Sequence, residues 1–95
     1  SFYFGCEADD PIAAWAFNTR VNRTTLKAMF SSDIAHFDVI DMREVLEEAH
    51  ELVDDGLLDA QQFREFTFAN AVSLHGGMNP DFFKGTVVEA AVAKL

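Results

Sequence analysis

The 95-residue sequence has little of several features that mark special classes of protein. It has one cysteine, Cys6, so no internal disulfide can form and the composition is compatible with a reducing cytosol. Its 7 Lys and Arg against 16 Asp and Glu give a net charge of −9, which argues against nucleic-acid and anionic-membrane partners. No apolar run approaches the roughly 20 residues that cross a bilayer, and no signal-peptide pattern opens the chain. We therefore expect a cytoplasmic protein.

What is present is typical of a folded chain. Apolar residues make up 49% of the sequence, 10 of them Phe, and 95 residues are enough for one domain at most. The excess of acidic residues lies entirely within residues 33–65, because the flanking segments are each neutral. A solvated helix face explains this charge more simply than an acidic docking surface does.

Spacing predicts two strands with a helix between them. Phe2–Gly5 is short, aromatic and ended by glycine, and Leu26–Phe30 has apolar residues on one face. Between them, Asp10 and Pro11 have the character of a cap and first position for a helix over Ile12–Phe17. Parallel strands need such a crossover, so this order predicts a parallel pair.

Capping signatures predict several helices after the second strand. Three pairs have the capping-box spacing, and Gly56 supplies a left-handed stop for the first helix. The pairs are Asp41 with Glu44 for a helix over 42–55, Asp59 with Gln62 for a helix or broken pair ending at Gly76–Gly77, with Asn70 as the break and new cap, and Thr86 with Glu89 for a helix over 87–94.

The loops that follow the two strands carry acidic residues. Glu7, Asp9 and Asp10 follow the first strand, and Asp33, His36 and Asp38 follow the second. The carboxyl ends of parallel strands lie at one edge of a sheet, so these side chains are expected near each other. Carboxylate and imidazole ligands favour a divalent-metal site. The alternative is structural, with Asp33 and Asp38 capping turns and His36 bonded to a nearby carbonyl.

Three segments resemble the amidohydrolase superfamily of metal-dependent hydrolases, in the branch that includes non-oxidative decarboxylases. The run from Phe30 to Asp38 resembles the family's segment of the eighth strand. The run from Phe2 to Pro11 resembles the preceding strand and loop, and the run from Glu65 to Gly76 resembles the C-terminal helix. The resemblance implies a mostly helical α/β fragment, namely the last two β/α units of a (β/α)8 barrel plus C-terminal helices. Residues 1–95 would then be a single partial domain, the C-terminal quarter of the barrel.

The same resemblance implies roles for two residues. Asp33 matches the aspartate that completes the metal site of the family and exchanges protons, and His36 follows in the loop that contacts substrate. The intact parent would hold zinc or manganese and act on a small-molecule substrate, by hydrolysis or decarboxylation. The family's upstream histidine ligands have no counterpart here, so we expect the isolated chain to hold no metal and to be inactive.

A second interpretation is an interaction module without catalysis. A two-stranded parallel sheet leaves two edges open, and the sequence is rich in phenylalanine, including Phe63, Phe66, Phe68, Phe82 and Phe83. A small, acidic, helical chain of this kind is expected to form homo-oligomers through its aromatic surface or strand edges. The two remaining histidines have structural interpretations, His50 as a partner of Glu47 and His75 as a cation at a helix C-terminus.

Overall fold

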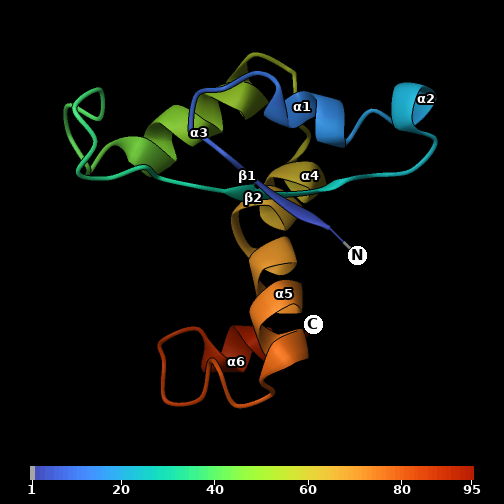
Figure 1. Ribbon diagram of the computed structural model, residues 1–95, viewed down its shortest axis with the longest axis vertical. Helices are drawn as coiled ribbons and strands as arrows, with labels where there is room; N and C mark the ends of the chain where they lie inside the picture. The colour runs from blue at the N-terminus through green and yellow to red at the C-terminus, as the bar shows by residue number, and fades with distance from the viewer. Residues whose placement is uncertain (1) are drawn as a thin grey trace.

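A computed structural model describes residues 2–95 (Figure 1). At its centre are two short parallel strands, β1 (Tyr3–Cys6) and β2 (Lys27–Phe30), which pair from Tyr3 with Lys27 to Cys6 with Phe30. The crossover between them contains the predicted helix, α1 (Ala13–Ala16), and a second one, α2 (Thr19–Asn22), which the sequence analysis missed. The signal for α2 was Asn18, whose side chain accepts hydrogen bonds from the first turn.

The helices after β2 follow the predicted order, but two of the three caps differ. These helices are α3 (Val45–Asp54), α4 (Ala60–Arg64), the π-helical segment η1 (Glu65–Ala69), α5 (Asn70–Met78) and α6 (Glu89–Val92). The box at Asp59 and Gln62 is confirmed, with both reciprocal bonds present at 2.8 and 2.9 Å. Gly56 has a φ of +72° after α3, as the predicted left-handed stop requires.

The capping boxes at Asp41 and Thr86 were wrong. The Asp41 carboxylate turns to the Arg43 guanidinium, at 2.7 and 2.9 Å, and α3 begins later without a side-chain cap. The Thr86 hydroxyl donates back to the Phe83 carbonyl, and α6 covers only residues 89–92. In both places a local hydrogen-bond partner, the Arg43 side chain or the Phe83 backbone carbonyl, competes with the helix N-terminus.

The core lies where α1, β2, α3 and the π-helical segment meet. Phe66 of η1 is its only large side chain that is fully buried, among the residues described, and its ring meets the Phe30 ring edge-on at 6.1 Å. The other buried residues of the core cluster are Ala13, Ala16, Phe17, Ala28, Leu52 and Leu58. Figure 1 shows α5 running away from the strands, with α6 near its far end. Beyond Val72 no residue is buried, so this arm lies outside the core.

Asn70 ties the arm to the sheet. It was predicted to begin a new helix, and it does begin α5, but its side chain does not cap the helix. Instead the Asn70 side-chain amide donates to the Ala28 carbonyl of β2, at 2.8 Å. The Cys6 carbonyl accepts from Ser31 on the inner side of the pair, so alternation places the Ala28 carbonyl on the outer edge of β2. Asn70 therefore covers that edge at Ala28.

These observations contradict the predicted fold class. Residues 2–95 form a small, mostly helical unit with a two-stranded parallel sheet, and nothing in it shows a piece of a (β/α)8 barrel. In a barrel the outer edge of β2 would pair with a further strand, whereas here Asn70 bonds its Ala28 carbonyl. Within the described part of the chain, no helix has the length and apolar character to cross a membrane.

Candidate functional site

The loop after β2 brings Asp33, His36 and Asp38 together, as the metal-site hypothesis requires. The His36 Nδ1 atom lies 2.6 Å from an Asp38 carboxylate oxygen and 3.4 Å from one of Asp33. One ligand atom of each residue lies within 4.8 Å of the others. The tight turn that does this places Asp33 and Ala35 at φ of +48° and +76°, so the loop is held in a left-handed conformation that only a few residues favour.

Electrostatics within the loop bind its members to one another. The hydrogen bond from His36 to Asp38 is the main reason that the pKa of His36 is raised above 6.5, and the charges of Asp33, Asp38 and Glu7 act in the same direction. The same hydrogen bond lowers the pKa of Asp38. Because all three side chains are about half exposed, water screens these interactions. The raised pKa therefore extends the imidazolium form of His36, held by carboxylates, to pH values above 6.5.

The two acidic loops share one cavity, as parallel topology predicts. A cavity of about 340 Å³ lies between them and is lined by Glu7 and Asp9 from the first loop and by Asp33 and Asp38 from the second. Asp10 does not take part, because its carboxylate accepts from the Ile12 backbone, at 2.9 Å, at the start of the α1 turn. The sequence analysis missed Glu48, which reaches the same cavity from α3.

The chemistry of the donors fits a divalent cation. Two carboxylates and one imidazole are ligands that zinc and manganese accept, and three protein ligands leave a position for water. The ligand atoms are close enough for one ion to contact all three after small side-chain rotations. The imidazole must lose its proton to coordinate, so the hydrogen bond to Asp38 competes with an ion. Asp33, His36 and Asp38 are thus the residues that would hold a metal.

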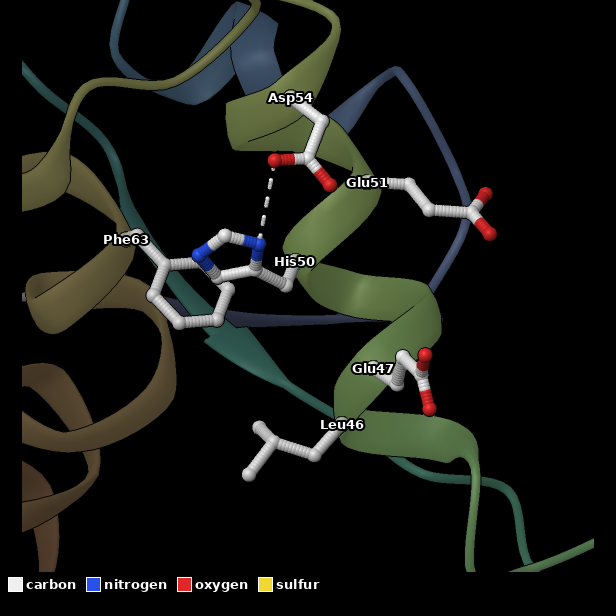
Figure 2. Close-up of a pocket in the computed structure, with 6 residues that line it drawn as sticks. All are labelled: Leu46, Glu47, His50, Glu51, Asp54 and Phe63. Carbon is white, nitrogen blue, oxygen red and sulfur yellow. Dashed lines mark ion pairs between the residues drawn. The ribbon is translucent and has the colours of Figure 1, made fainter.

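A second cavity lies around His50, between α3 and Phe63 of α4 (Figure 2). Here the prediction of a Glu47 partner was wrong. His50 Nδ1 lies 3.4 Å from Asp54, one turn further on, and its ring meets the Phe63 ring edge-on at 5.2 Å. Figure 2 shows Glu47 and Glu51 pointing away from the imidazole. This arrangement is the solvated helix face that the charge pattern predicted.

His75 and Cys6 have packing roles in the structure. The His75 ring stacks on Phe82 at 4.7 Å, in the last turn of α5, where its backbone carbonyl also accepts from Asn79. Cys6 packs against the core, and burial followed by the charge of Asp10 raises the pKa of its thiol. A thiol with a raised pKa is a weak nucleophile, so Cys6 adds no reactive group to the site. His75 lies in α5, outside the two loops that form the site.

Comparisons with protein-family models, with curated proteins and with solved structures find no match to this chain. The resemblance to the amidohydrolase superfamily therefore stays a prediction, and function is inferred from the geometry of the loops.

Proposed function

We propose that this chain is part of a metal-dependent hydrolase of the amidohydrolase type, in which the loop after β2 supplies metal ligands. The observation that carries the proposal is the convergence of Asp33, His36 and Asp38, whose ligand atoms lie within 4.8 Å of one another. They sit at the carboxyl end of a parallel strand, which is where α/β proteins place their functional residues.

The individual roles follow from chemistry and position. A divalent ion, when bound, would lower the pKa of a water molecule enough for hydrolysis near neutral pH. Asp33 is the proposed ligand and proton-transfer group, since its half-exposed carboxylate can take up a proton at the cavity and return it. His36 would bind the ion or orient substrate, and Asp38 would supply a second carboxylate ligand once an ion displaces the proton that bonds it to His36 at 2.6 Å. The substrate would be a small molecule.

Metal titration of the chain tests the proposal. Because the structure brings three ligand atoms within 4.8 Å of one another, we now expect the isolated chain to bind an ion, contrary to the expectation from the sequence alone. Calorimetry with Zn²⁺ and with Mn²⁺ at pH 8 should show one site in the wild type and at least a tenfold weaker one in Asp33→Asn. The matched control is Asp81→Asn, which removes the same charge from an exposed position outside the cluster. Equal affinities for the wild type and Asp33→Asn, or no binding at all, would exclude Asp33 as a ligand. Turnover belongs to the intact parent, where Asp33→Asn should abolish it.

A second function, self-association, is favoured by a separate observation. Large apolar side chains are exposed on several elements, and β1 pairs with no strand other than β2 within residues 2–95. The exposed set, between the start of the chain and β2, includes Phe2, Phe4, Ile12, Trp15, Val21 and Leu26. Exposed apolar surface beside an open strand edge is typical of a protein interface. We therefore propose homo-oligomers, to be tested by light scattering coupled to size exclusion.

A further inference from the structure

The two edges of the sheet differ in what covers them. The outer edge of β2 is covered at Ala28 by the Asn70 amide, at 2.8 Å. The Cys6 carbonyl accepts a hydrogen bond from Ser31, the residue after β2, so it points toward β2. Because the main-chain groups of successive residues in a strand point to alternate sides, those of Tyr3 and Gly5 point to the outer edge of β1. Phe4 and Gly5 are exposed there. Within residues 2–95, β1 therefore presents the edge that is open to another strand.

The composition of residues 2–6 favours pairing of β1 with the same strand of a second copy. Residues 2–6 are Phe, Tyr, Phe, Gly and Cys, without a charge or a proline. Natural edge strands usually carry charged residues or proline, which prevent pairing with another chain. The net charge of −9 lies in residues 33–65, whereas residues 1–32 are neutral, so two copies can meet at β1 without bringing like charges from that strand together.

We propose that two copies of this chain pair through β1, antiparallel and about a twofold axis at Phe4, to form a four-stranded sheet. This inference rests on the self-association proposed above and adds its location and register. Tyr3 of one copy would exchange both main-chain hydrogen bonds with Gly5 of the other, and the reverse, which makes four bonds. Phe4, 47% exposed, would face its own copy across the axis.

This arrangement also explains why assembly would stop at two copies. An antiparallel pair about a twofold axis uses the same edge of both chains, so neither β1 edge remains open. The new outer edges belong to β2 of each copy, where Asn70 already bonds the Ala28 carbonyl. The twofold pairing through β1 therefore favours a closed dimer over a growing sheet.

A cysteine pair tests the register directly. With Phe4 on the axis, residue 2 of one copy lies opposite Cys6 of the other, in a pair with Cα atoms about 4.5 Å apart, which suits a disulfide. Within one chain, positions 2 and 6 are about 13 Å apart along an extended strand and cannot be bridged. Phe2→Cys should thus yield an oxidised dimer, linked by disulfides between positions 2 and 6, whereas Phe2→Cys with Cys6→Ser should not.

A charge placed on the axis tests the interface without crosslinking. Phe4→Lys puts two ammonium groups opposite each other and should weaken the dimer by at least about tenfold. Val87→Lys, at a fully exposed site, makes the same change of charge away from β1 and should leave the dimer intact. Circular dichroism checks that both variants fold.

The outcomes separate the inference from the function on which it rests. A wild-type dimer that gives the crosslink and is lost in Phe4→Lys supports both. A dimer without the crosslink, or one unaffected by Phe4→Lys, overturns pairing through β1 while self-association stands. A monomer at 100 μM overturns both.

Discussion

Replacing Phe66 by alanine should remove most of the stability of this fold. Phe66 is 0% exposed and, among the residues described, is the large side chain that is fully buried. Truncation of a buried phenylalanine costs about 3–5 kcal/mol, through lost transfer free energy and the cavity left behind. Its ring also loses the edge-on contact with Phe30, at 6.1 Å.

The starting stability is expected to be low, which makes that loss decisive. The described chain exposes 6832 Å², whereas a compact protein of 10.6 kDa exposes about 5,500 Å². It therefore buries less surface than its size allows, and its free energy of unfolding should lie near or below about 5 kcal/mol. Phe66→Ala should leave a large fraction of the molecules unfolded at 25 °C.

Urea denaturation followed by far-ultraviolet circular dichroism measures this loss. The matched control is Phe37→Ala, which truncates the same side chain at a position that is 88% exposed and should change stability by less than about 0.5 kcal/mol. If Phe66→Ala costs less than about 1 kcal/mol, or no more than Phe37→Ala, the assigned core is wrong.

Three further predictions concern single contacts. His36 should titrate above pH 6.5 by NMR, and its midpoint should move to lower pH in Asp38→Asn; an unmoved midpoint refutes the contact. Since the folded-state pKa is raised, the stability that this contact contributes is present below pH 6.5 and is lost as the pH rises through the folded-state pKa. Asp59→Ala should lower stability by about 1 kcal/mol in thermal melts, because the capping box is lost, and an unchanged melt excludes that role. Asn70→Ala should cost about 1–3 kcal/mol by leaving the Ala28 carbonyl unpaired, and a neutral result means that water replaces the amide.

The capping signatures show how far local sequence predicts this structure. Asp41 with Glu44 and Asp59 with Gln62 have the same spacing, but only the second pair forms a capping box. The difference is Arg43, whose guanidinium takes the Asp41 carboxylate at 2.7 Å. A pattern predicts a cap only where no stronger partner for the capping group lies within reach.

Contacts between residues far apart in the sequence could not be predicted from local capping patterns. Asn70 is 42 residues from Ala28, and neither its spacing nor its type indicates that it covers the edge of β2. The barrel prediction is contradicted here, because an intact barrel would place a further strand at the edge where Asn70 bonds Ala28. By contrast, the shared cavity of the two acidic loops was predictable, because it follows from parallel pairing alone. Glu48 was missed because its place depends on how α3 packs beside the loops.

The protonation of His36 sets the condition under which the proposed metal site can be tested. Asp38 and Asp33 raise the pKa of His36, so at pH 6 the imidazole carries the proton that a metal ion must displace. Below that pKa, the apparent affinity for Zn²⁺ should fall about tenfold per pH unit, if one proton is released. Calorimetry in two buffers of different ionisation enthalpy counts that proton. A pH-independent affinity with no proton released would remove His36 from the ligand set and leave the two carboxylates, which favour Mn²⁺ over Zn²⁺.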